Sequence, residues 1–397
     1  MFTNNHAASV ITAILPNSTN RAVLDGVLEP SGYAALTWHA RGTLLKDNWL
    51  QRFLPPISPA KTMVQLLLPD EVTEPVMNRI VEAANLHKQA TGAVFSQPCD
   101  GVFVGDEFPA LHALKEAPPS RREHELSADL SLIVCIVDKA RSDRIARAAV
   151  AAGAHGPVIY LCEGRGLRDR LGWLRITKQH EKDVLLVLCG LGDIDQVFQA
   201  MASAGELHLP GRGFMYRTDI TKGLYNLPSL VSNRHYAANV QQIIHAIDHL
   251  TGHTHWRDGA LRNVGAGAST VGLSMETSAF PMLRDQLCVS TVVRREQQPA
   301  LIDLLLDHGI KGINFTFARF DNAAATAQLG GAKITDDYAV MNAVCARDVG
   351  MQVVAAIENH TGDAGITDLL VYVNPVRQVA TYVYRPGQAD NRAPQPA

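Results

Sequence analysis

Residues able to bind an anion gather in a loop between two strand-like runs, "PVIYLCE" and "DVLLVLC". Between Glu163 and Lys182 the chain carries six basic residues and three acidic ones, and the loop opens on Gly164, Arg165 and Gly166. Glycine lets a backbone come close to an anion, and the planar guanidinium of arginine donates paired hydrogen bonds to phosphate or carboxylate. These residue types in this order predict an anion-binding loop.

A second glycine-arginine segment, "LPGRGF", contains Gly211, Arg212 and Gly213. Two such segments side by side between packed units would supply the backbone N–H groups and cations of a phosphate-binding cleft. Arg41 of "HARG" and Arg319 of "FARF" are predicted to occupy the position of Arg165 in two other parts of the chain. The alternative is that each segment is a turn bearing a solvated charge.

Histidines supply the competing chemistry. They lie with one aspartate between residues 245 and 255: His245, Asp248, His249, His253 and His255. His245 and His249 are one helical turn apart, a spacing at which two imidazoles can bind zinc or another divalent metal. The alternative is an ordinary amphipathic helix whose apolar face packs on the protein. A metal-dependent enzyme or metal-binding protein is therefore the second functional hypothesis.

The elements needed to position these residues recur along the chain. Strand–helix–strand–strand–helix–strand (βαββαβ) is the order expected for unit one (residues 8–105) and for unit two (128–226). Residues 227–285 are expected to be a connector with one helix, and residues 286–386 a degenerate unit three. In unit three the segment "MQVVAAIE" (351–358) is expected to be a strand. A repeated βαββαβ unit predicts an α+β fold of tandem ferredoxin-like units.

The second unit resembles the PII signal-transduction family and its PII-like relatives. The residues that carry the resemblance are Gly153, Gly156, Gly164, Gly166, Gly205, Gly211, Arg212, Gly213 and Phe214. The resemblance implies an adenine nucleotide, ATP or ADP, bound in clefts between neighbouring units. The glycines and arginines of the two loops would lie on its phosphate side. It also implies three units closed into a pseudo-trimer in one chain, or two units completed by other copies of the chain.

The loop from Leu167 to Lys182 departs from the family because it is short and contains no tyrosine. A different effector or protein partner from those usual in the family is therefore expected. The first functional hypothesis is a non-enzymatic sensor that binds a small anionic effector and passes the signal to a protein target.

Composition limits the partners and the compartment. The chain has 397 residues and a net charge of −3, which gives no overall reason to expect nucleic acid as a partner. No apolar run is long enough to suggest membrane insertion. The six cysteines are scattered without metal-binding spacing, and most lie in apolar runs, so reduced thiols and a cytoplasmic location are expected. No G-x-S-x-G nucleophile motif is present.

Overall fold

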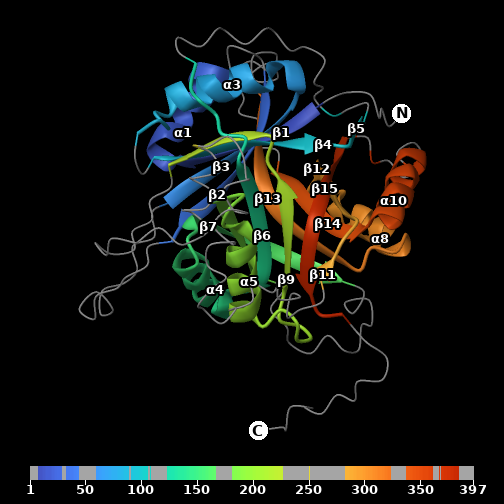
Figure 1. Cartoon of the computed structure of the whole chain (residues 1–397). Coiled ribbons are helices and arrows are strands. Elements are labelled where there is room, and N and C mark those ends of the chain that lie inside the picture. The colour runs from blue at the N-terminus through green and yellow to red at the C-terminus, as the bar shows by residue number, and fades with distance from the viewer. Residues whose placement is uncertain are drawn as a thin grey trace, which may run out of the picture.

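The computed structural model describes residues 8–28, 33–43, 60–88, 91–105, 108, 123–166, 181–226, 250, 282–322, 337–360, 366 and 368–383. Within these ranges the chain forms fifteen strands and six α-helices, and about half of it is strand. Figure 1 shows the strands gathered at the centre and the helices set around them in pairs.

The first third of the chain begins with a strand and alternates strands with helices. Its elements are β1 (Ala8–Pro16), α1 (Asn17–Val23), the π-helical turn η1 (Leu24–Leu28), β2 (Ala34–Gly42), β3 (Ala60–Pro69), α3 (Asp70–Ala83) and β4 (Gly92–Cys99). Pro69 ends β3, and Asp70 and Glu71 follow in the first turn of α3. Their negative charges interact favourably with the positive end of the helix dipole and so stabilise the helix start at this place in the sequence.

The second third has the same succession. Its elements are β6 (Leu130–Asp138), α4 (Lys139–Ala151), β7 (His155–Gly166), β8 (Glu181–Gly190), α5 (Ile194–Gly205) and β9 (Phe214–Asp219). In α4 the buried residues, among them Ile145, Ala149 and Val150, recur at helical spacing. They pack on the sheet while the charged residues of its first two turns face away from it.

In the last third, one element differs in type from the prediction. This third consists of β12 (Gln286–Arg294), α8 (Gln298–Asp307), β13 (Gly312–Asn322), β14 (Asp337–Ala346), α10 (Arg347–His360) and β15 (Leu369–Thr381). Residues 351–358, expected to be a strand, lie inside α10. Gly350, Val353, Val354 and Ile357 are buried at helical intervals, whereas the short apolar run 351–358 taken alone fits a buried strand equally well.

Three short strands connect the thirds. These are β5 (Gly101–Val104), β10 (Lys222–Asn226) and β11 (Met282–Leu283). β10 pairs with β4 of the first third, whereas β5 and β11 both pair with β15 of the last third. The segments that follow the first and second thirds thus add strands to the last and the first third, respectively.

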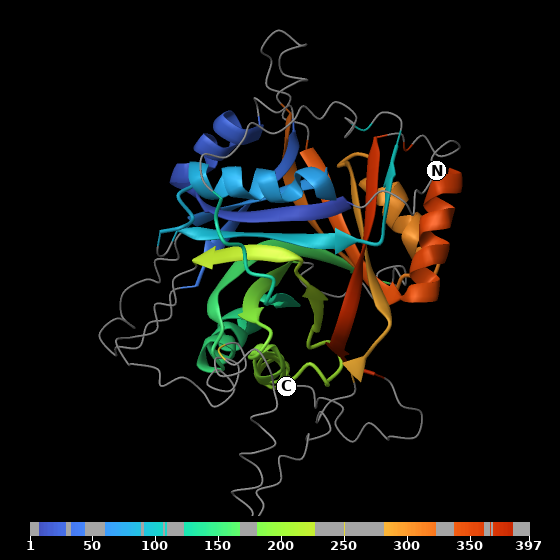
Figure 2. The same ribbon diagram turned by 45° about the horizontal axis from the view of Figure 1, so that its top comes forward.

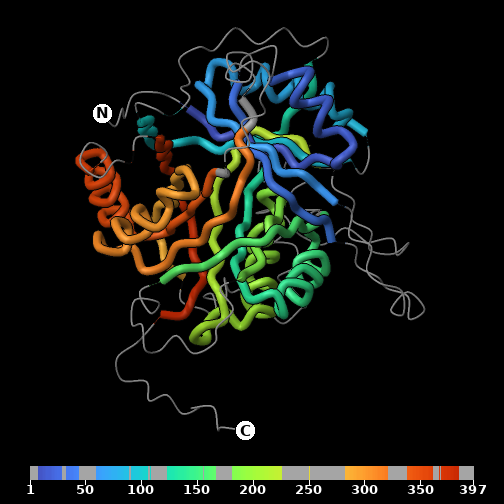
Figure 3. Tube along the Cα trace, turned by 180° about the vertical axis from the view of Figure 1, so that it is seen from behind, coloured from blue at the N-terminus to red at the C-terminus, as the bar shows by residue number. Residues whose placement is uncertain are grey.

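All of these strands belong to one sheet, which closes on itself. The order along it is β10-β4-β1-β3-β2-β13-β14-β12-β15-β9-β6-β8-β7, and β2 also pairs with β7, as β13 does. Nine strands form a closed antiparallel barrel. Figure 3 shows from behind how strands from distant parts of the chain meet there.

The prediction of tandem ferredoxin-like, PII-type units is therefore wrong as a description of the fold. The strands of each third do not form a separate small sheet with its own edges, because they continue into the strands of the other thirds. β2, β7 and β13 would each be an exposed edge in an isolated unit. Pairing them with one another satisfies backbone N–H and C=O groups that an open edge leaves unpaired.

The hydrophobic core has two kinds of region. One lies within the sheet assembly and includes Trp38, Tyr216 and Tyr372 from the three thirds. The others lie between the sheet and the helices of each third, for example around Met77, Phe198 and Leu305. Figure 2 shows the helices on the outside of the strands. The long strands are thus covered on two faces, which explains why they are almost continuously apolar.

Candidate functional site

The charged residues of the candidate site are carried by the first two turns of α4. Lys139, Arg141, Asp143 and Arg144 follow β6 directly in the sequence "KARSDR". Because residues three apart lie on one helix face, Arg141 and Arg144 point to one side. Asp143 contacts a different partner, so this short stretch of helix takes part in two separate ionic groups.

The first group, which we call the arginine cluster, consists of Arg141, Arg144 and Arg212 around Glu206. Oxygen Oε2 of Glu206 lies 3.2 Å from Nη1 of Arg141, 3.8 Å from Nη2 of Arg144 and 3.6 Å from Nε of Arg212. Three guanidinium groups therefore share one carboxylate, which leaves an excess of two positive charges in the cluster. Arg141 is the least exposed of the three, with 17% of its side chain accessible.

Local backbone geometry brings Glu206 and Arg212 to this place. Glu206 ends α5 in the left-handed conformation, with φ at 53°. The turn that follows leads through Gly211 and Arg212 to Gly213, which has φ at 135°. A Cβ atom on Gly213 would lie 2.6 Å from Cγ1 of Val137 and 2.7 Å from the carbonyl oxygen of Ile136. Close packing of the turn on β6 therefore explains the glycine at 213 without any ligand.

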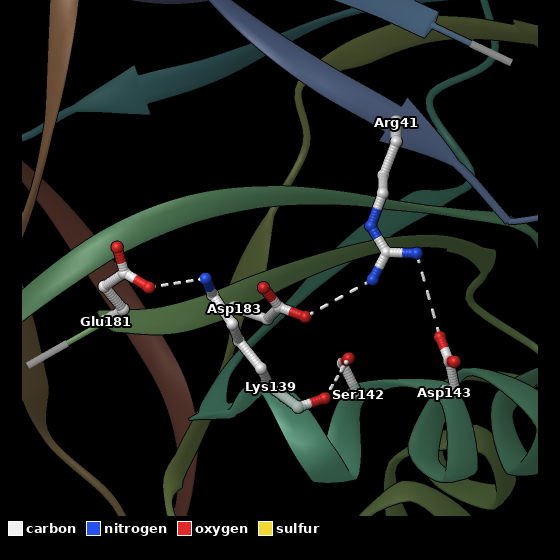
Figure 4. A network of polar contacts seen from close by, with 6 residues as sticks. All are labelled: Arg41, Lys139, Ser142, Asp143, Glu181 and Asp183. Atoms are coloured by element: carbon white, nitrogen blue, oxygen red, sulfur yellow. Dashed lines mark hydrogen bonds and ion pairs between the residues drawn. The ribbon is translucent and has the colours of Figure 1, made fainter. Parts of the chain in front are cut away.

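The second group, which we call the junction contact, joins the first third to the second. Figure 4 shows Arg41 of β2 reaching between Asp183 of β8 and Asp143 of α4. Its Nη2 lies 3.4 Å from Oδ2 of Asp183, and its Nη1 lies 3.8 Å from Oδ1 of Asp143. Only 5% of the Asp183 side chain is exposed, against 68% for Asp143. Arg41 thus neutralises a buried carboxylate, which would otherwise be costly to hold in the interior.

Beside the junction contact, Lys139 and Glu181 form a further ion pair, with Nζ 2.5 Å from Oε2. Ser142 donates to the backbone oxygen of Lys139 within the same turn of α4, as Figure 4 also shows. Every charge drawn in this network has an opposite charge beside it. The junction contact has two carboxylates for one guanidinium, an excess of one negative charge, whereas the arginine cluster has an excess of two positive charges.

The structure corrects the predicted equivalence of Arg41, Arg165 and Arg319. Arg41, Glu163 and Arg319 each pair with the first residue of the following strand of their own third. Arg165 lies two residues further along β7, opposite Ile313 of β13. The ladder of β7 shifts its register between His155 and Val158, so counting residues from the preceding glycines misjudged the alignment.

The two predicted phosphate loops lie at the same end of the sheet's strands, but they adjoin different strands. Gly164–Gly166 close β7, while Gly211–Gly213 precede β9, and β8 and β6 lie between these two strands. With strands about 4.8 Å apart, three steps across the sheet amount to about 14 Å. The structure therefore does not bring the two loops into one compact cradle, and the cations that share a carboxylate with Arg212 come from α4 instead.

The predicted metal ligands, His245, Asp248, His249, His253 and His255, lie outside the described residues. Within the described ranges, no group of three or more histidine, cysteine, aspartate or glutamate side chains could hold a metal ion.

The six cysteines are all free, and four of them are buried. Burial raises the pKa of the thiols of Cys135 and Cys189 to about 12. Such thiols are poor nucleophiles because the reactive thiolate is not formed at neutral pH.

Several residues of the site were missed in the sequence, namely Arg141, Arg144, Glu206, Asp143 and Asp183. The spacing of Arg141 and Arg144 was a usable signal, because it places two cations on one helix face beside a predicted glycine turn. No local signal marks Asp183, whose partner Arg41 is 142 residues away.

Comparison with known proteins gives little guidance. No family model matches the chain, and no curated protein matches it. Among solved structures, the crystal structure of aspartate kinase from Synechocystis aligns over 93% of this chain and 43% of that chain. The identity is 9% and the TM-score 0.20, so this chain spans less than half of that protein and the likeness carries no argument. Over the part of the chain that the structure describes, no helix is long and apolar enough to span a membrane.

Proposed function

We propose that the protein is a non-enzymatic sensor that binds a small phosphate-bearing molecule, an adenine nucleotide in the first instance, at the arginine cluster. The observation that carries the proposal is the sharing of Glu206 by Arg141, Arg144 and Arg212. Three guanidinium groups around one carboxylate retain both positive charge and hydrogen-bond donors. Arginine donors in a fixed planar geometry suit phosphate oxygens.

The position of Arg212 supports the same ligand class. Arg212 lies between two glycines in the segment whose sequence resembles the nucleotide-contacting loop of PII proteins. The adenine group of the proposed ligand and the sensor role rest on this resemblance. The phosphate group of the ligand rests on the arginine cluster. A bound phosphate would link α4, the end of α5 and the turn before β9. A ligand that binds one arrangement of these segments more tightly than another shifts their populations, and a partner can read that shift.

The proposal is tested by isothermal titration of the full chain with ATP, ADP, AMP, adenosine and inorganic tripolyphosphate. We expect ATP and ADP to bind and adenosine to bind much more weakly. Arg212→Ala should lower the affinity about tenfold, as expected for the loss of one charge-assisted hydrogen bond. Arg21→Ala is the matched control, because Arg21 is also ion-paired to a carboxylate but lies on α1 and is 85% exposed.

Tripolyphosphate separates the two parts of the proposal. If it binds as well as ATP and loses affinity in Arg212→Ala, the cluster binds phosphate without recognising adenine. If neither ATP nor ADP binds, or if both variants bind equally well, the proposed function is wrong.

A further inference from the structure

Two histidines from the ends of different helices meet on the outside of the last third. His308 directly follows α8, and His360 is the last residue of α10. Figures 1 and 2 both show these two helices next to each other on the outside of the strands. The centroids of the two imidazole rings lie 5.9 Å apart, and the ring planes are inclined by 74°. The fold of the last third thus brings two metal-ligating side chains together.

The hydrogen bonds of the two rings determine which nitrogen atom is able to bind a metal. Nδ1 of His308 lies 2.9 Å from the carbonyl oxygen of Leu304, and Nδ1 of His360 lies 2.8 Å from that of Ala356. A carbonyl oxygen only accepts, so each Nδ1 carries the hydrogen and donates it, and the lone pair of the neutral ring is on Nε2. Histidine ligands in metal sites are oriented by the same kind of Nδ1 hydrogen bond to a backbone carbonyl.

Both Nε2 atoms are left without a role in the protein. Hydrogen bonding to the last turn of a helix accounts for Nδ1 in each ring and not for Nε2. Neither histidine forms another hydrogen bond or an ion pair with any described residue. His308 is partly exposed and His360 is exposed, so an ion has access to the pair from solvent.

The separation of the rings suits one shared ion. Metal–nitrogen bonds of about 2.0–2.1 Å place two imidazole centroids about 5 Å apart on a tetrahedral ion. The observed 5.9 Å differs from this by about 1 Å, which small rotations of two side chains at the surface remove.

The donor atoms limit the kind of metal. Over the described part of the chain, the pair is not joined by a third histidine, cysteine, aspartate or glutamate that would complete a larger group of ligands. Two imidazole nitrogens favour copper, nickel and zinc, whereas magnesium and calcium require oxygen ligands. Water molecules would complete the coordination. Such a site binds less tightly than a structural zinc site with four protein ligands, and its open positions accept a further ligand from solution.

We propose that His308 and His360 together bind one divalent transition-metal ion through their Nε2 atoms and so link α8 to α10. The site shares no residue with the arginine cluster, so either site can be present without the other. It also shares no residue with the metal site predicted between residues 245 and 255.

Acylation of histidines by diethyl pyrocarbonate tests the proposal on the full-length wild-type protein, with the modified peptides quantified by mass spectrometry. A ring whose Nε2 binds a metal does not react. At a Ni²⁺ concentration about ten times the dissociation constant, we expect His308 and His360 both to react about tenfold more slowly. His39, an exposed histidine of β2, should react at an unchanged rate, and Mg²⁺ should protect none of the three.

Three results of this experiment would overturn the proposal. Unchanged rates at both histidines would show that no ion binds there. Protection of only one would show that the ion is not shared. Equal protection by Mg²⁺ would show that the imidazoles are not the ligands.

His308→Ala tests whether the two histidines act together. The variant leaves a single imidazole for the ion. We expect protection of His360 to require about a hundredfold more Ni²⁺, because the second ligand no longer acts at a high effective concentration. His39→Ala is the matched control and should leave protection of His360 unchanged. An equal Ni²⁺ requirement in the two variants contradicts a shared ion. The wild-type experiment decides the matter even if His308→Ala does not fold.

Discussion

The arginine cluster and the junction contact lie on the same two turns of α4, yet they differ in charge balance and in burial. In the junction contact one guanidinium lies between two carboxylates, of which Asp183 is almost fully buried. In the arginine cluster three guanidinium groups share Glu206, whose side chain is 38% exposed. Arg41 neutralises the buried carboxylate of Asp183 and so stabilises the contact between the first and second thirds. The arginine cluster retains accessible positive charge, and the proposed anion binding rests on that property.

The largest expected effect is a loss of unfolding free energy at alkaline pH. It arises from buried thiols and not from the arginine cluster or the junction contact. Burial raises the pKa of the Cys135 and Cys189 thiols to about 12, above about 8.5 for an unfolded cysteine. Below the unfolded value both states are protonated, and the full stability is present. As the pH rises between these values, the unfolded chain loses protons first, and each thiol lowers the unfolding free energy by about 1.4 kcal/mol per pH unit.

Denaturant unfolding at pH 8, 9 and 10 measures this loss. We expect the unfolding free energy of the double variant Cys135→Ala, Cys189→Ala to depend less on pH than that of the wild type. The guanidinium groups keep their charge throughout this range, so the cost of Arg41→Ala should be the same at pH 8 and pH 10. A cost that changes with pH would contradict the view that the junction contact is an arginine–carboxylate group.

The next effect tests the junction contact itself. Arg41→Ala leaves the buried carboxylate of Asp183 without its cation, and we expect a loss of about 2 kcal/mol in the free energy of unfolding. This is below the range for fully buried pairs, because 41% of the Arg41 side chain is exposed to solvent. Asp143→Ala is the matched control, since it removes only the exposed partner and should cost less than about 0.5 kcal/mol. Equal losses would mean that burial of Asp183 does not distinguish the two contacts.

The smallest effect concerns the charge excess of the arginine cluster. Glu206→Gln removes the shared carboxylate and raises the excess from two positive charges to three. We expect about threefold tighter binding of ATP at low salt, and a smaller gain at high salt because the groups are accessible and screened. Titration of wild type and variant at two salt concentrations measures this. Weaker binding in Glu206→Gln would show that Glu206 positions the arginines for the ligand.

Much of the local structure could be predicted because it depends on neighbouring residues. The run Leu130–Asp138 is almost continuously apolar and rich in β-branched residues, as a buried strand is, and Asp70 with Glu71 marks the start of a helix. The segment 351–358 could not be assigned reliably, since a short apolar run of this kind fits a buried strand and a buried helix equally well. The fold class could not be predicted from the repeats. The sequence of one repeat does not determine whether its edge strand is exposed to solvent or paired with a strand of another repeat.

The candidate site shows the same division. The sequence by itself determined that Arg141 and Arg144 share a helix face, since the helical period alone sets that spacing, and that Arg212 lies in a glycine turn. Only the tertiary structure decided that Glu206 and Arg212 meet Arg141 and Arg144, and that Arg41 meets Asp183. These contacts depend on strand registers and on closure of the sheet, which are set by pairing between segments far apart in the chain.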